Sequence, residues 1–287
     1  MNTQKCFVFS DLSSYIKVPS ELFNYTLYLL FALAHNLKVL VHTMKLVQGL
    51  KSLLQKRFYS RQLYEDGTNL KPPWRVMFYG TDDFSLACLN ALCMKYKNKR
   101  LISNLEVVTL KRTKFNSVHK YALKENLVLH NWPINPLDCN RFHIGVVVSF
   151  GHLIPEDVIK NFSLGMINVH ASLLPRWRGA APAIYALAND DEETGISVMK
   201  IKPNKYDIGE IISQTRVKIL PQIKLPQLLD TLAELGANEL IKVLEDLPFY
   251  LKQAKPQPQE GVTYGEPHPF ESVKRSPPPI KKCVSIF

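Results

Sequence analysis

The sequence predicts an α/β fold built on an open, mostly parallel β-sheet flanked by helices. Short apolar runs alternate along the chain with segments of helical periodicity. One run, HIGVVVSFG at 143–151, is almost continuously apolar and rich in valine, which is typical of a strand buried on both faces of a parallel sheet. With 46% hydrophobic and 21% charged residues among 287, the chain can bury a sizeable core, and global disorder is excluded.

Each predicted element follows from a local pattern. Asp82 or Asp83 can cap the first helix, Pro155 suits the first turn of another, and leucines line one stripe of the last. Right-handed crossovers between parallel strands then give a Rossmann-like arrangement. The predicted strands are 74–80, 106–110, 127–130, 143–151, 165–171, 195–201 and 210–217. The predicted helices are 82–96, 117–126, 155–162, 182–190 and 226–247.

Composition divides the chain into three parts. The globular domain is predicted to begin at Pro72 and to end at residue 251, so it spans 72–251. Residues 1–71 form an extension largely outside the fold. Seven of the 19 prolines fall between Pro256 and Pro279, so 252–287 is predicted to be a disordered, proline-rich tail.

The extension has the composition of a targeting segment. Residues 1–60 hold seven lysines and arginines against two acidic residues, and 41–62 has no acid and leucines near helical spacing. A basic, amphipathic helix of this kind is typical of a mitochondrial presequence. The apolar stretch at 23–44 is interrupted by polar residues and is short of the roughly 20 apolar residues of a membrane span. A membrane anchor, an ordered helix and an untranslated extension remain as alternatives.

Net charge and cysteine usage restrict the class of protein. A formal charge of +11 suits a partner that is a polyanion (RNA, DNA or an anionic membrane), although mitochondrial matrix proteins are also often basic. The five cysteines are odd in number and form no CxxC pair, which argues against a disulfide framework or zinc ribbon and favours a reducing compartment. Phosphate-loop, GxGxxG and HExxH motifs are missing from the sequence.

Residues 167–182, INVHASLLPRWRGAAP, carry the main chemical signal. Asn168 and His170 lie two apart on a predicted strand, so both side chains leave one face near its C-terminal end, where open α/β sheets bind ligands. Taken singly, a core histidine, a structural amide and a turn aspartate at Asp207 are the ordinary interpretations. Together, Asn168 and His170 followed by a loop that contains Ser172 and Pro175, and later by Asp207, predict a ligand site.

These residues also carry a family resemblance. The pattern N-x-H-x-S-L-L-P-x-x-R-G, followed by a D-x-G turn, resembles the folate-dependent formyltransferases. LPRWRGAAP and LGANELI resemble the branch that acts on methionyl-tRNA, and its mitochondrial members most of all. The resemblance covers roughly Pro72 to Pro267, about two-thirds of the chain. It implies transfer of a formyl group from 10-formyltetrahydrofolate to the methionine amino group of Met-tRNA, for translation initiation in the mitochondrial matrix.

The resemblance assigns site residues by motif. Asn168, His170 and Asp207 fall on catalytic positions. Asn168 would donate to the oxyanion, an effect of about 10²–10³-fold in rate. His170 would act as an acid, an effect of about 10²–10⁴-fold, and Asp207 would orient it and favour its charged form. Neither a metal nor a covalent enzyme intermediate is needed. The tetrahydrofolate-binding loop falls on Ser172, Leu173, Leu174 and Pro175.

The partners implied are initiator Met-tRNA and folate, with a monomeric enzyme and no stable membrane association. The tRNA phosphates would meet basic side chains, which give affinity without reading sequence. These candidate tRNA contacts are Lys111, Arg112, Lys114, Arg176 and Arg178.

Two alternatives stay open. The family has a C-terminal, barrel-type domain that helps to hold tRNA, and SVKRSPPPIKKCVSIF does not resemble it. The chain could therefore be a truncated form that binds folate or a partner without efficient formylation of tRNA. Alternatively, the acceptor could be a sugar-nucleotide amine, glycinamide ribonucleotide or water, because the catalytic set alone does not select the acceptor.

Overall fold

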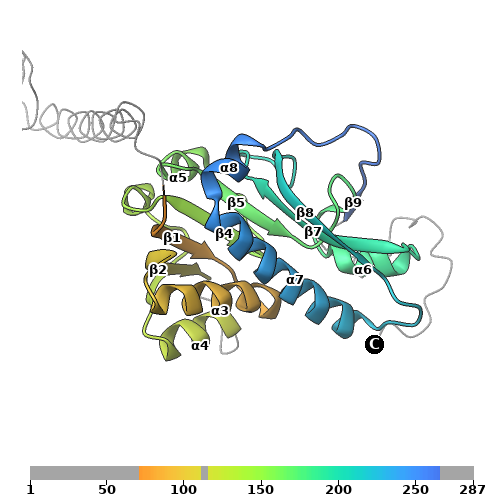
Figure 1. Cartoon of the computed structure of the whole chain (residues 1–287), viewed down its shortest axis with the longest axis horizontal. Coiled ribbons are helices and arrows are strands. Elements are labelled where there is room, and N and C mark those ends of the chain that lie inside the picture. The colour runs from red at the N-terminus through yellow and green to blue at the C-terminus, as the bar shows by residue number, and fades with distance from the viewer. Residues whose placement is uncertain (1–70, 111–115, 266–287) are drawn as a thin grey trace, which may run out of the picture. The chain divides into compact units, whose positions relative to one another are not determined.

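The computed structural model describes residues 71–110 and 116–265, which lie in one compact unit of the chain, Gly67–Phe287 (Figure 1). The predicted targeting segment, the basic residues Lys111, Arg112 and Lys114, and the tail from residue 266 onward lie outside the described residues. Within the described ranges, no helix is both long and apolar enough to cross a membrane.

A seven-stranded sheet with the order β3-β2-β1-β4-β5-β7-β8 forms the centre of the fold. Neighbours from β3 to β5 pair in parallel, whereas β5–β7 and β7–β8 are antiparallel. The strands are β1 Trp74–Tyr79, β2 Ile102–Thr109, β3 Val128–Asn131, β4 Ile144–Val148, β5 Met166–His170, β7 Glu193–Lys200 and β8 Ile211–Lys218. The prediction of an open, mostly parallel sheet is confirmed.

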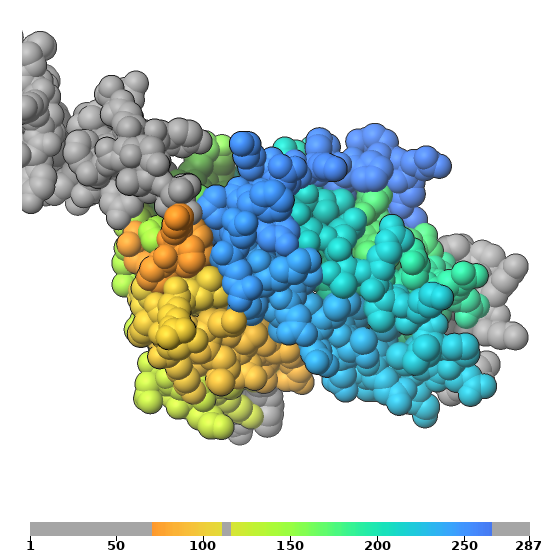
Figure 2. All heavy atoms as spheres, viewed as in Figure 1, coloured from red at the N-terminus to blue at the C-terminus, as the bar shows by residue number. Residues whose placement is uncertain are grey.

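Helices flank this sheet. They are α3 Asp83–Lys97, α4 Ser117–Lys124, α5 Glu156–Ile159, α6 Pro182–Ala188, α7 Leu225–Glu245 and α8 Leu247–Lys252, with a 3₁₀ turn, η2, at Pro136–Cys139. The long helices α3 and α7 lie side by side over one face (Figures 1 and 2). One apolar core lies between that face and these helices, and a second core, on the opposite face, is closed by η2 and α5.

Local chemistry explains the two long helices. Asp82 caps α3, because its carboxylate accepts the Ser85 N–H at 2.9 Å while the Ser85 hydroxyl accepts the Asp82 N–H at 3.0 Å. In α7, Leu228, Leu232 and Leu240 are at most 1% exposed, so the leucine stripe is core packing. Both features were predicted from the sequence.

The described, ordered chain extends past residue 251, where the sequence pattern placed the end of the domain. The ordered chain continues through α8 and on to Gly265, where β9 (Tyr264–Gly265) pairs in parallel with β6 (Arg178–Gly179). Leu247, Leu251 and Ala254 pack against the apolar core, but from Lys255 onward the stretch is fixed mainly by backbone and side-chain hydrogen bonds to other parts of the domain. It therefore has no periodicity for a sequence pattern to reveal.

Candidate active site

Strand β5 positions two of the three predicted catalytic side chains. Because side chains alternate along a strand, Ile167 and Val169 enter the core under α3 and α7, while Asn168 and His170 leave the other face. His170 is the last residue of β5 and is only 6% exposed. The site therefore lies at the C-terminal end of a parallel strand, as predicted.

Asp207 joins these two side chains. Its Oδ1 accepts a hydrogen bond from Asn168 Nδ2 at 2.9 Å, and its Oδ2 lies 3.6 Å from His170 Nδ1. The Gly179 N–H donates to the same Oδ2 at 2.9 Å. Asp207 is 8% exposed and has a positive φ of 49°, so the turn before β8 aims its carboxylate back at β5. Asp207, which lies 39 residues after Asn168 in the sequence, thus meets the two β5 side chains at one point.

The hydrogen bonds of His170 assign its tautomer. Nε2 lies 2.8 Å from the carbonyl oxygen of Trp177, and because a carbonyl can only accept, Nε2 carries the proton. Nδ1 is then the nitrogen that faces the Asp207 carboxylate, and the one that can gain or release a proton during a reaction.

The predicted folate loop, Ser172–Pro175, is held from behind by two strands. The buried Ser197 hydroxyl, on β7, donates to Ser172 O at 2.6 Å and accepts the Leu174 N–H at 3.0 Å. Gln214, on β8, donates to Leu174 O at 2.9 Å and to the Ser197 hydroxyl at 2.8 Å. The loop backbone is therefore fixed by side chains from both antiparallel strands.

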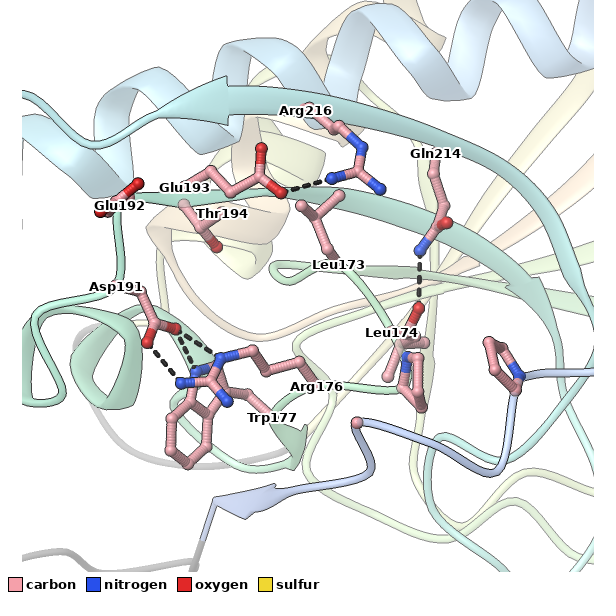
Figure 3. A pocket seen from close by; sticks show the side chains of 13 residues that line it. Leu173, Leu174, Arg176, Trp177, Asp191, Glu192, Glu193, Thr194, Gln214 and Arg216 are labelled. Atoms are coloured by element: carbon pink, nitrogen blue, oxygen red, sulfur yellow. Dashed lines mark hydrogen bonds and ion pairs between the residues drawn. The ribbon is translucent and has the colours of Figure 1, made fainter.

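A cavity of about 480 Å³ opens beside this loop (Figure 3). Leu173, Leu174 and Pro175 form its apolar lining, and Gln214 and Arg216 border it from β8. Asn168, His170 and Asp207 are not among the lining residues, so the cavity adjoins the loop and not the predicted catalytic side chains. The remaining lining residues are Arg176, Trp177, Asp191, Glu192, Glu193, Thr194, Pro258 and Gly261.

The two arginines that follow the loop, Arg176 and Arg178, form hydrogen bonds and ion pairs with other side chains of the domain. Arg176 pairs with Asp191 through two nitrogens, and Trp177 Nε1 donates to the same carboxylate at 2.7 Å (Figure 3). Arg178 is 8% exposed, and its Nε and Nη2 donate to Gln257 Oε1 at 2.9 and 2.7 Å. The described contacts of Arg178 are internal, whereas the side chain of Arg176 is 41% exposed.

The described cysteines are not suited to nucleophilic roles. Burial raises the pKa of Cys88 to about 12 and that of Cys139 to about 11, so both are protonated thiols near neutral pH. Burial also raises the pKa of Cys93. Among the residues that the structure describes, no group of histidine, cysteine and acidic side chains is arranged to hold a metal ion.

Four further residues hold the site and were not predicted from the sequence. Ser197 is a polar residue within the apolar run Ile196–Met199 of β7, which is a weak signal that could have drawn attention to it. Gln214 lies on an alternating, half-exposed strand, and Gln257 and Thr263 lie in the proline-rich stretch. The roles of these last three residues depend on long-range contacts that the sequence pattern does not encode.

The fold and the site together define a class of protein. A family model described as "Formyl transferase" matches residues 97–244, which include Asn168, His170 and Asp207. That match covers more than half of the chain, and the chain belongs to this family.

Individual relatives are more specific than the family model about which proteins the chain is similar to. The chain is 43% identical over 198 residues to a protein of Rattus norvegicus named mitochondrial methionyl-tRNA formyltransferase, a match covering 68% of this chain and 51% of that protein. It is 34% identical over 201 residues to the methionyl-tRNA formyltransferase of Paracoccus denitrificans, with 67% and 66% covered. The chain thus spans about half the length of the mitochondrial relatives that it matches.

Solved structures share the fold at lower identity. An N-formyltransferase from Helicobacter canadensis, solved with folinic acid and dTDP-3-aminofucose, superimposes with a TM-score of 0.54 at 18% identity. The match covers 67% of this chain and 71% of that one.

Proposed function

We propose that this chain transfers the formyl group of 10-formyltetrahydrofolate to the amino group of methionine on Met-tRNA. The observation that carries the proposal is the convergence of Asn168 and His170 on one carboxylate, that of Asp207. The names of the relatives at 43% and 34% identity support the choice of acceptor.

The first step is attack by the amine nitrogen on the formyl carbon. A carbon–nitrogen bond forms, and the carbonyl oxygen becomes a tetrahedral oxyanion. An asparagine amide has two N–H donors, and Asp207 Oδ1 engages only one of those on Asn168. The amide is thereby held in one orientation, with its second N–H free to stabilise the oxyanion, an effect of about 10²–10³-fold in rate.

The second step breaks the bond between the formyl carbon and N10 of the folate. The amine nitrogen loses a proton and N10 gains one, so the overall reaction is balanced without a further reactant. His170 Nδ1 is the protein atom suited to carry this proton, because Nε2 is committed to Trp177 O. The carboxylate of Asp207, 3.6 Å from Nδ1, stabilises the ring while it holds the extra proton.

The folate donor would be held along the loop Ser172–Pro175, whose apolar side chains adjoin the cavity. Lys111, Arg112, Lys114 and the exposed part of Arg176 remain candidates for the tRNA phosphates. Residues 1–71 would direct the protein to the mitochondrial matrix, and the catalytic domain would extend from residue 72 to Gly265.

The proposal is tested by following labelled formyl groups from 10-formyltetrahydrofolate in the presence of one acceptor at a time. The full chain should formylate mitochondrial Met-tRNA at least 100-fold faster than a dTDP-amino sugar or glycinamide ribonucleotide. Preference for either small amine would reassign the acceptor. Folate binding without transfer to any acceptor would instead support the truncated, non-productive form.

A further inference from the structure

The segment that follows α8, residues 253–265, returns to the candidate active site. Lys255 exchanges two backbone hydrogen bonds with Ile211 at the start of β8, at 2.8 and 2.9 Å. Ten residues later, β9 pairs with β6 beside the loop that carries Trp177. The segment therefore passes first the turn of Asp207 and then the turn of Trp177, the two groups that face the two ring nitrogens of His170.

Gln257 holds the Asp207 turn. The side chain is 7% exposed, and Nε2 donates to the carbonyl oxygens of Asp207 and Gly209 at 2.8 and 2.9 Å. Its Oε1 accepts two hydrogen bonds from Arg178, so the donors and the acceptor of the amide are all engaged. Asp207 has a φ of 49°, a conformation that a residue with a side chain adopts only when its surroundings hold it there. Gln257 supplies two of those restraints.

Thr263 holds the Trp177 turn in a similar way. Its hydroxyl accepts the Trp177 N–H at 2.8 Å, and its own backbone pairs with Pro175 and Arg178. Trp177 also has a positive φ, of 57°, and its carbonyl is the acceptor for His170 Nε2. The hydroxyl therefore secures the N–H of the residue whose carbonyl fixes the tautomer of His170, and the Thr263 carbonyl accepts the Arg178 N–H of the peptide that contains that carbonyl.

We propose that Gln257 and Thr263 are positioning residues for His170, acting through Asp207 and Trp177 respectively. The inference rests on the proposed function, because it assigns His170 the proton transfer. On this proposal, residues 253–265 belong to the catalytic domain and contribute to the geometry of the candidate active site.

The first test is the near-isosteric variant Gln257→Glu. A glutamate keeps the acceptor for Arg178 but loses both N–H donors to the Asp207 turn, so the domain should still fold. We expect kcat to fall at least 10-fold, with KM for the folate donor within threefold and the pH–rate profile displaced. A lower melting temperature with unchanged kcat and pH profile would show that Gln257 only stabilises the fold, and would overturn the proposal.

The second test needs no substrate, so it separates this inference from the proposed function. In wild-type protein, NMR should find a slowly exchanging Nε2–H on His170, because Trp177 O protects it. Thr263→Val removes the acceptor for the Trp177 N–H and should speed that exchange at least 10-fold, whereas Thr263→Ser should preserve protection.

The matched control is Ser213→Ala, which removes a hydrogen bond to Glu239 on the far side of β8 and should leave the exchange of His170 unchanged. Equal protection in Thr263→Val and wild type would overturn the role of Thr263. Protected exchange in a wild-type protein that formylates no acceptor would contradict the proposed function alone.

Discussion

Ser197→Ala tests whether the Ser172–Pro175 loop binds the folate donor. The Ser197 hydroxyl is fully buried and takes part in three hydrogen bonds, with Ser172 O, Leu174 N and Gln214 Nε2. Its removal leaves the buried Leu174 N–H without a partner, which costs about 1–3 kcal/mol. That cost falls on the native conformation of the loop, because both backbone partners belong to it.

The loss should appear as weaker binding of the donor. At 1.4 kcal/mol per factor of ten, it corresponds to a change of about 5- to 150-fold in the equilibrium between the competent and the displaced loop, and Kd rises by up to that factor. The rate at saturating donor should change little, because the contacts of His170 and Asp207 are untouched. A titration with an unreactive folate such as folinic acid measures Kd, and urea denaturation measures the free energy of unfolding.

Ser213→Ala is the appropriate control for this prediction as well. Ser213 donates to the buried Glu239, where burial raises the carboxyl pKa but hydrogen bonds from Ser213, Thr215 and Lys242 together bring it below its usual value. Loss of one such hydrogen bond should lower the free energy of unfolding without changing the affinity for the folate donor. An unchanged Kd in Ser197→Ala, alongside reduced stability, would show that the loop is not the donor site.

Three further changes probe the turn, the carboxylate and the pH response. Asp207→Asn should lower the single-turnover rate by about 10²–10⁴-fold, because the charge facing the imidazole is lost, while the circular dichroism spectrum stays unchanged. Gly209→Ala should lower both the melting temperature and activity, since its Cβ would lie 1.6 Å from Lys200 O and the turn would have to move. Burial, aided by the charge of Arg75, lowers the pKa of His143 to about 4 from the usual 6.5, so between these values the unfolded chain binds a proton that the folded chain does not. The free energy of unfolding should therefore fall by about 1–2 kcal/mol from pH 7 to pH 4, a figure reduced for solvent screening, and His143→Asn should flatten this dependence in denaturation curves.

The sequence predicted most of the fold because its strands and helices carry strong periodic patterns. The valine-rich strand β4 and the leucine stripe of α7 record burial directly in residue type. Asn168 and His170 were predictable as neighbours because alternation on a strand fixes their common face. Asp207 was placed beside them by its motif and by no local pattern.

The supports of the site were not predictable in the same way. Gln257 lies between two prolines, and its hydrogen bonds to Arg178, Asp207 and Gly209 reach residues about 50 to 80 positions earlier in the chain. Polar contacts between segments so far apart leave no periodicity, and proline-rich composition suggested disorder. The ordered chain beyond Lys252 was missed for that reason.

The most direct test of the central claim is a double-mutant cycle on Asn168 and His170. Single-turnover transfer of labelled formyl to Met-tRNA would be compared in wild type, Asn168→Ala, His170→Ala and the double variant, at saturating folate. We expect each single change to slow transfer at least 100-fold, and the double variant to be much less impaired than the product of the two effects, because Asp207 couples the two side chains. A His170→Ala protein that transfers formyl within threefold of the wild-type rate would contradict the role of His170 in proton transfer.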